Sequence, residues 1–183
     1  QADGNGTVYA EGANYTLTSG TDKLFAQWTL RDDVPYTIRH YKQNEQGTDY
    51  DLADTETDAT DSTLKGTPGT AAAYESHIKK DTTAYPGFTY SSATWQIGEQ
   101  GTAVGTPLMI DAEGRLIINL YYNRTVLQYT VQHYQQTLPG SEEPYALVES
   151  ETPSGRFGTT AAFNSKSFSG FTYQDGKTTW QIG

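Results

Sequence analysis

The 183-residue sequence contains no cysteine and a single methionine. Structural disulfides, thiolate catalysis and cysteine-based zinc sites are therefore excluded. Cations are also scarce: 12 Lys and Arg stand against 22 Asp and Glu, which gives a formal net charge of -10. Because phosphate groups and anionic membranes are bound by clustered cations, the sequence predicts neither a nucleic-acid partner nor binding to a membrane surface.

Long apolar runs are missing as well, and none approaches the ~18–20 residues that span a bilayer, so membrane insertion is not expected. No basic-then-apolar signal segment is present, and Gln1 is not a natural start. The sequence is therefore expected to be a fragment of a longer protein, with its export signal or anchor elsewhere.

Aromatic residues, in contrast, are plentiful: 14 Tyr, 6 Phe and 3 Trp occur together with 18 Gly. This composition is typical of short strands joined by tight turns, in which tyrosine supplies apolar area and a polar tip. In a module of fewer than about 100 residues the core is small, so large aromatic side chains must supply much of the buried area.

Internal repetition is the strongest signal in the sequence. The spacing between matching blocks is 93 residues at the start and 85 at the end, so the first copy carries an insertion around Asp51–Ser62. Four blocks recur in the same order: YTIRHY (36–41) with YTVQHY (129–134), GTAAAY (69–74) with GTTAAF (158–163), GFTY at 87–90 and 170–173, and TWQIG at 94–98 and 179–183.

A further pattern sets the phase of the repeat. Leu24–Leu30 (LFAQWTL) lies 93 residues before Ile117–Asn123 (IINLYYN), and each is expected to be an aromatic-bearing strand that closes a module. The short link Arg31–Asp33 favours pairing of each closing strand with the body before it, while pairing with the body after it stays open.

The phase predicts two tandem modules. The first covers 1–124, and the second covers 125–183, whose following strand is expected to have been cut away. Within the first module, 34–124 is a complete unit and 1–33 is a leading strand segment equivalent to 94–126.

The local patterns predict mainly strands. Val34–Tyr41 alternates as a half-buried strand does, and Leu116–Tyr122 is apolar on both faces, as expected of a central strand. Thr70–Lys80 (TAAAYESHIKK) is the one convincing helix, with Thr70 as a possible cap and cations in its last turn.

This order of elements predicts an α+β fold. Each module is expected to be a small β-grasp (ubiquitin-like) unit, in which one short helix crosses a mixed sheet, and two such units in tandem give an elongated molecule. The alternative is an immunoglobulin-like β-sandwich, which has more strands and no helix.

The three histidines offer little chemistry. His40 and His133 occupy the same place in the two copies, on the strand face shared with Ile38 and Val131. A catalytic histidine needs a nucleophile or carboxylate beside it, and no such partner repeats at matching positions, so both are interpreted as structural. His77 has no equivalent, and three histidines alone do not make a zinc site.

Acidic residues follow at short intervals after the first strand. Asp49, Asp51 and Asp54 are candidate calcium ligands, but the loop pattern of an EF-hand is missing. Their alternation with Thr and Ala favours a solvated edge strand whose charges prevent edge-to-edge pairing. No metal or other cofactor is therefore expected.

The repeated aromatic residues are the candidate ligand contacts. Trp95 and Trp180 recur inside TWQIG, where a core role is favoured over stacking on a sugar. Tyr41 and Tyr134 point away from the apolar strand face and are better surface candidates. No phosphate-binding loop and no G-x-S-x-G elbow is present, so an enzyme is not expected.

Together, YTIRHY, PGFTY and TWQIG in one copy and YTVQHY, SGFTY and TWQIG in the other resemble the mucus-binding (Mub, MucBP-type) repeats of lactobacilli. LFAQWTL also resembles the closing strand of the Listeria–Bacteroides surface repeats, which are small β-grasp modules. The resemblance covers nearly the whole chain, although the acidic insertion departs from the short family pattern.

The resemblance implies a non-catalytic adhesion repeat on a bacterial cell surface or cell wall. Such a repeat binds mucin glycoproteins through their glycans, as a monomer within a tandem array that gains avidity from linked copies. Two alternatives stay open. β-grasp modules also capture immunoglobulins by a sheet edge and a helix face, and a module of this kind can serve as a structural stalk.

Overall fold

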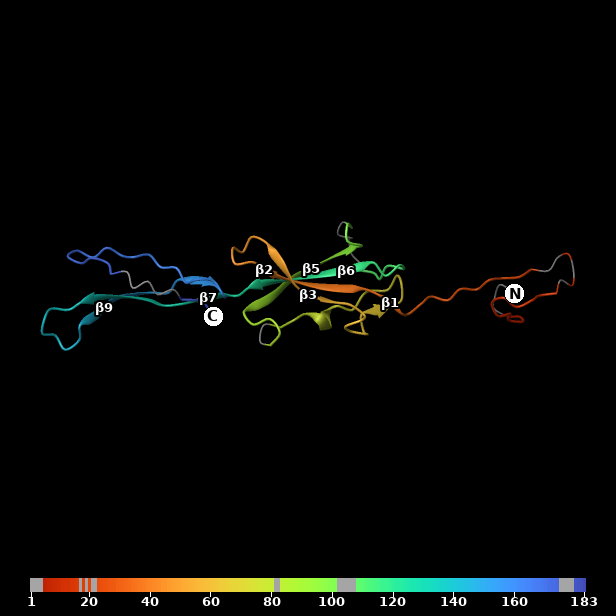
Figure 1. Ribbon diagram of the computed structural model, residues 1–183, viewed down its shortest axis with the longest axis horizontal. Coiled ribbons are helices and arrows are strands. Elements are labelled where there is room, and N and C mark those ends of the chain that lie inside the picture. Colours follow the sequence, from red (N-terminus) through yellow and green to blue (C-terminus); the bar gives the residue numbers. More distant parts are fainter. Residues whose placement is uncertain are drawn as a thin grey trace.

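The computed structural model describes residues 5–16, 18, 20, 23–80, 83–101, 108–174 and 180–183. The chain is elongated (Figure 1). A tail without ladder pairing lies at one end, a four-stranded sheet lies in the middle, and a set of two-stranded pairs lies at the other end.

The central sheet is mixed and has the strand order β3-β2-β6-β5. β6 pairs parallel with β2, whereas β3 and β5 join antiparallel on the outer sides. The predicted central strand is confirmed, since β6 lies between two neighbours and its first five residues are all buried. The strands are β2 (Thr37–Gln43), β3 (Tyr50–Glu56), β5 (Phe88–Ile97) and β6 (Leu116–Arg124).

One face of this sheet carries the hydrophobic core. Ile38, Ile118, Leu120 and Tyr122 are fully buried there. Residues from the connections, such as Leu64, pack over them. A two-stranded pair of β1 (Val34–Pro35) and β4 (Lys65–Gly66) flanks the sheet. The other face of the sheet carries mainly polar and aromatic side chains, together with the buried Ile117.

The predicted helix over Thr70–Lys80 is wrong. Only a single 3-10 turn, η1 (Glu75–His77), forms there. Ala71 bridges to Met109, and Ile110 N–H donates to the Thr70 carbonyl, so this backbone is committed to a neighbouring segment instead of helical bonds. Tertiary pairing here outweighs the helix propensity of the alanines.

The described residues are thus mostly β with almost no helix. The helix that distinguishes a β-grasp is missing from them, so that prediction fails in its helical part, while the mixed sheet is confirmed. The nearly all-β character is compatible with the sandwich alternative. The described residues contain no helix that is long and apolar enough to cross a membrane.

The second half reproduces part of the first. Its antiparallel β8–β9 pair carries a bulge between His133 and Tyr134, at the place where the β2–β3 pair carries one between His40 and Tyr41. The β7–β10 pair likewise corresponds to β1–β4. The strands are β7 (Val126–Gln128), β8 (Val131–Gln136), β9 (Tyr145–Glu151) and β10 (Ser154–Arg156).

The insertion in the first copy lies later than expected. Equivalent residues of β3 and β9, such as Glu56 and Glu151, are 95 positions apart in the sequence. The equivalent residues Lys65 and Ser154 are only 89 positions apart. The extra residues therefore lie between Glu56 and Lys65, which overlaps the later part of the predicted range around Asp51–Ser62. The predicted edge strand is confirmed, because β3 ends the sheet and most of its side chains are exposed.

Leu24–Leu30 was expected to be a strand, and this prediction is wrong. The segment has no ladder partner among the described residues. A strand needs a ladder neighbour to satisfy its backbone, and this segment pairs with no described residue in that way.

The two TWQIG blocks also differ in structure. Trp95 lies within β5 opposite Ile118 of β6. In the second copy, Ile182 exchanges backbone hydrogen bonds with Gly158 and Thr159, which is how Ile110 pairs with Gly69 and Thr70. Within the described part of the chain, β5 pairs with β6 alone, and the second TWQIG block has no such strand beside it. The block instead takes the place of the 108–110 segment.

The two halves meet at a packed junction. β6 runs to Arg124, whose guanidinium Nη1 donates to the Phe157 carbonyl at 2.8 Å. The Phe157 ring packs edge-on against Phe88 with ring centroids 6.4 Å apart. Thr125 N–H donates to Gly87 O, and Phe157 N–H donates to Thr125 O, both at 2.9 Å.

Candidate functional site

Three tyrosines gather on the sheet face opposite the core. They come from adjacent strands: Tyr50 from β3, Tyr41 from β2 and Tyr121 from β6. Tyr41 and Tyr121 are paired in the parallel register, so their rings stack with centroids 5.4 Å apart and planes 24° apart. Tyr50 meets Tyr121 edge-on at 5.0 Å. We call these three residues the tyrosine cluster.

The alternation of side chains along each strand puts the three tyrosines on the same face of the sheet. Side chains alternate between the two faces of a strand. Ile38 and His40 face the core, so Tyr41 faces outward, and Tyr121 does so for the same reason between Leu120 and Tyr122. All three cluster tyrosines are half-buried. Each ring is therefore held by its neighbours and still presents part of its surface to solvent.

Polar groups surround the cluster: most are neutral, and the charged Arg39, which lies beside Tyr41 on the same strand face, is paired with Glu99. Tyr50 Oη donates to Asn123 Oδ1 at 2.5 Å, and Asn123 Nδ2 donates to Ser91 Oγ at 3.2 Å. Asn119 Nδ2 donates weakly to Gln96 Oε1 at 3.4 Å, while its Oδ1 is buried without a hydrogen-bond partner in the described structure. The face thus offers amide and hydroxyl groups in reach of an aromatic surface.

The candidate residues from the sequence divide between the two faces. Tyr41 belongs to the cluster. Trp95 packs half-buried against the core, on the opposite face, as the core interpretation expects. Trp180 is 70% exposed and Tyr134 is 53% exposed, both in the second half. The structure therefore does not bring the four candidates together.

Sequence reasoning missed Tyr50 and Tyr121. Tyr121 lies in a stretch that is apolar on both faces, so it was counted with the core. Strand parity relative to Ile118 was the signal that would have separated it. Tyr50 has a counterpart in Tyr145, which is 57% exposed, because β3 and β9 share a register.

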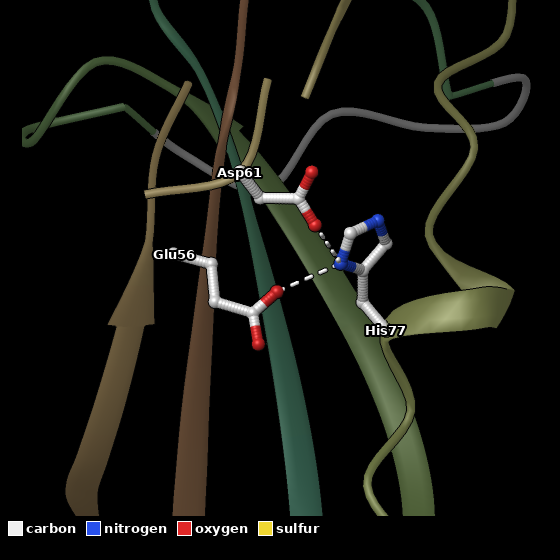
Figure 2. A group of neighbouring side chains, drawn as sticks. All are labelled: Glu56, Asp61 and His77. Atoms are coloured by element: carbon white, nitrogen blue, oxygen red, sulfur yellow. Dashed lines mark hydrogen bonds and ion pairs between the residues drawn. The ribbon is translucent and has the colours of Figure 1, made fainter. Parts of the chain in front are cut away.

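The proposed calcium ligands do not converge. Asp49 and Asp54 each accept a hydrogen bond at 2.8 Å from the backbone N–H of the following residue. Asp51 is exposed on the same edge strand. Two acids and a histidine gather instead near the end of β3. Glu56, Asp61 and His77 place their possible metal-ligand atoms within 4.8 Å of one another (Figure 2).

This acid–histidine group is an ion-pair network. His77 Nδ1 donates to Glu56 Oε2 at 2.7 Å and lies 3.8 Å from Asp61 Oδ2 (Figure 2). Lys79 Nζ also donates to Glu56. Burial alone would raise the pKa of Glu56, but the hydrogen bonds from Lys79 and His77 hold it below its usual value. A metal ion at this place would have to displace the lysine.

His40 extends the network into the core. It is fully buried, and its Nε2 lies 3.2 Å from Glu56 Oε1, outside hydrogen-bond alignment. Burial lowers the pKa of His40 against the opposing charge of Glu56, so the ring is neutral near pH 7.

The buried Tyr122 hydroxyl connects this histidine to the backbone. Tyr122 Oη accepts the Lys79 N–H at 3.0 Å and lies 2.9 Å from His40 Nδ1. The arrangement that uses every group has the hydroxyl donating to Nδ1, with the ring proton on Nε2 facing Glu56. Burial raises the pKa of Tyr122 to about 12, so the hydroxyl keeps its proton.

The second half repeats the histidine–carboxylate–lysine arrangement. His133 Nε2 donates to Glu151 Oε1 at 2.5 Å, and Lys166 Nζ lies 3.4 Å from the same oxygen. The expectation that no carboxylate repeats beside the histidines is therefore wrong. The two copies are 93 residues apart at the histidines and 95 at the glutamates, so a search at one fixed spacing misses the pair.

In each copy the histidine–glutamate pair is held by neighbouring side chains. In both copies the glutamate is bound to a lysine, and in the first copy the histidine lies under the core aromatics Tyr85 and Tyr122. Of the features described above, the outward tyrosine cluster combines a partly exposed aromatic surface with hydrogen-bonding side chains. Comparison with protein-family models, curated proteins and solved structures gives no match for this chain.

Proposed function

We propose that this chain is a non-catalytic adhesion repeat of a bacterial surface protein, which binds mucin glycans outside the cell through the tyrosine cluster of its central sheet. The observation that carries the proposal is the stacked pair Tyr41 and Tyr121, with Tyr50 edge-on beside it. The repeat motifs and their resemblance to mucus-binding repeats point in the same direction.

The chemistry of the face fits a sugar. A pyranose ring has an apolar face of C–H groups, which packs on an aromatic ring, and a rim of hydroxyl groups that each need a donor or an acceptor. The cluster supplies rings held in place by one another. Asn123, which is only half-buried, supplies an amide group beside them.

The charge of the chain also bears on the ligand. Mucins carry negative charge through sialic acid and sulfate, and this chain has a net charge of -10. Recognition must therefore use stacking and neutral hydrogen bonds, because overall charge slows the encounter. The cluster offers stacking and the neutral groups of Asn123 and Ser91, and the Arg39 cation beside Tyr41 is already paired with Glu99.

Weak binding at one site is compatible with adhesion. Tyr134 and Tyr145 repeat two of the three cluster tyrosines in the second half. Linked sites gain avidity without any new contact, provided that both can engage one glycoprotein. The helix face that immunoglobulin capture was expected to use is not formed among the described residues, and we do not favour that alternative.

The test is retention of the chain on immobilised mucin. Tyr121→Ala removes the ring shared by both contacts of the cluster, and loss of about 1 kcal/mol of stacking weakens binding at the cluster about fivefold. Tyr9→Ala is the matched control, because Tyr9 lies in the tail and is also partly exposed. Each variant is also applied to deglycosylated mucin and to non-immune immunoglobulin.

Binding to mucin that is lost on deglycosylation, and weakened by Tyr121→Ala but not by Tyr9→Ala, supports the proposal. Equal binding to mucin before and after deglycosylation contradicts it. Binding to immunoglobulin alone indicates the capture function, and binding to none of the three indicates a stalk.

A further inference from the structure

The second half of the chain has an unfilled position in its sheet. In the first half, β2 pairs with β3 on one side and with β6 on the other. In the second half, β8 pairs with β9, and its other edge has no partner strand among the described residues. A free strand edge exposes unpaired N–H and C=O groups and is a template for an added strand.

A groove lies beside this free edge. Its walls come from β8 and from the segments after residue 160. The lining residues include Val131, His133, Phe163, Phe168, Phe171 and Trp180.

Comparison of the two copies shows what the groove lacks. Val131 and His133 are only half-buried, whereas their counterparts Ile38 and His40 are completely buried. In the first half, β6 covers these positions, with Ile38 opposite Ile118 and His40 opposite Leu120. The groove is therefore the place of a β6-like strand. The displaced second TWQIG block, which would pair with that strand, agrees with this reading.

The chain itself carries a segment with the sequence pattern of such a strand. Leu24–Leu30 stands at the place of β6 in the repeat, 93 residues before Ile117–Asn123. Its alternation puts Leu24, Trp28 and Leu30 on one face. These side chains are 65%, 92% and 76% exposed. The segment also forms no ladder with any described residue.

The donor segment does not reach the groove of its own chain. It joins the central sheet through Arg31–Asp33, a link that spans at most about 11 Å. The nine residues of β6 alone extend about 30 Å. The tail and the second half lie at opposite ends of that sheet (Figure 1).

We propose that the Leu24–Leu30 segment of one copy inserts as a strand beside β8 in the groove of a second copy. The inserted strand would give β8 its second neighbour and the second TWQIG block a strand to pair with. Because donor and acceptor lie at opposite ends of one chain, the contact is head-to-tail and continues into linear oligomers. The proposal does not depend on the ligand of the tyrosine cluster.

Sedimentation velocity of the full 183-residue chain over a wide concentration range tests the proposal. The wild-type chain is expected to form a concentration-dependent ladder of dimers and longer species. Trp28→Asp places a charge on the apolar face of the donor and is expected to abolish the ladder. Val8→Asp makes the same change at another exposed tail position, 88% exposed, and is expected to leave the ladder intact.

A mixing experiment identifies the acceptor. Val131→Lys blocks the groove, and this variant is expected to be monomeric alone. Mixed with Trp28→Asp, it still supplies a donor segment, and the Trp28→Asp chain still supplies an acceptor, so a one-to-one dimer is expected. Hydrogen exchange of the β8 and β9 amides reports whether Val131→Lys keeps its fold.

A synthetic peptide of residues 23–33 gives a readout that needs no variant of the groove. In excess over the wild-type chain it is expected to shorten the oligomers and to protect the β8 amides from exchange. A chain that stays monomeric at every concentration, without protection of β8 by the peptide, overturns the proposal. Association that survives Trp28→Asp also overturns it, because a different surface is then responsible.

Discussion

The buried hydroxyl of Tyr122 allows a sharp test of how the core is held. Tyr122→Phe removes one oxygen and leaves the ring in place. The hydroxyl accepts the Lys79 N–H and pairs with His40 Nδ1, and Tyr122 and His40 are both fully buried. Its loss leaves two polar groups without their partner in a space that the phenylalanine ring does not open to water.

The expected cost follows from those two groups. A buried donor or acceptor left unsatisfied costs about 1–3 kcal/mol, so for two groups the free energy of unfolding is expected to fall by about 2–6 kcal/mol. Tyr50→Phe is the matched control. Its hydroxyl donates to Asn123 on the half-exposed face, where water can replace it, and the expected loss is below about 1 kcal/mol.

Urea unfolding followed by tryptophan fluorescence measures both variants. Trp95 lies in the sheet against the core, whereas Trp28 and Trp180 are already exposed, so the signal reports mainly on the first half. The slope with urea is expected to stay constant, since the surface exposed on unfolding does not change. Equal losses for the two variants would refute the claim that the Tyr122 hydroxyl serves two buried partners.

Two further predictions concern pH and the junction. Burial lowers the pKa of His40 from 6.5, and the pKa of Glu56 lies below 4.5 because the hydrogen bonds from Lys79 and His77 outweigh burial. In both cases the unfolded chain binds more protons than the folded chain. The free energy of unfolding is therefore expected to fall as the pH drops below about 6.5 and to fall further below about 4.5. Urea unfolding between about pH 7 and pH 4 measures this, and constant stability across that range contradicts it. Gly87 has a φ of 76°, and an added Cβ would lie 2.1 Å from the Phe157 ring. Gly87→Ala is expected to cost about 1–3 kcal/mol of backbone strain and to loosen the junction in addition, measured as faster proteolysis near Thr125. Gly69→Ala is the control: Gly69 has a φ of 77° and open space around it, so its substitution brings the backbone strain without the clash. Equal proteolysis of the two variants would show that Phe157 packing does not hold the halves together.

The sequence predicted best where one periodicity decides the structure. The alternation of Val34–Tyr41 and the apolar run Leu116–Tyr122 identify strands because burial on one face or on both leaves a direct mark on residue type. The repeat predicted that β8 would match β2, and even the bulge beside His133 follows the bulge beside His40.

Prediction from the sequence failed where a segment distant in the chain determines the local structure. Thr70–Lys80 has a helical composition, but its backbone is bound by Met109 and Ile110, which no local pattern reveals. The second TWQIG block differs from the first because its neighbouring strand, not its own sequence, sets its place.

The candidate site shows the same division. Tyr41 was identified from strand alternation, but its partners Tyr50 and Tyr121 are neighbours only after three strands have assembled. The Glu56–His40 contact was hidden by the change of spacing between copies.

The parallel pairing of β2 with β6 has a mechanical consequence. β2 lies near the start of the first half and β6 at its end, and the two run side by side in the same direction. Tension applied along the chain pulls them in opposite directions, so the hydrogen bonds between Thr37–Lys42 and Ile117–Tyr122 are loaded together in shear. Bonds that share a load resist more force than bonds that open one after another. The first half is therefore a clamp against stretching, and the second half gains the same resistance only when a parallel strand lies beside β8.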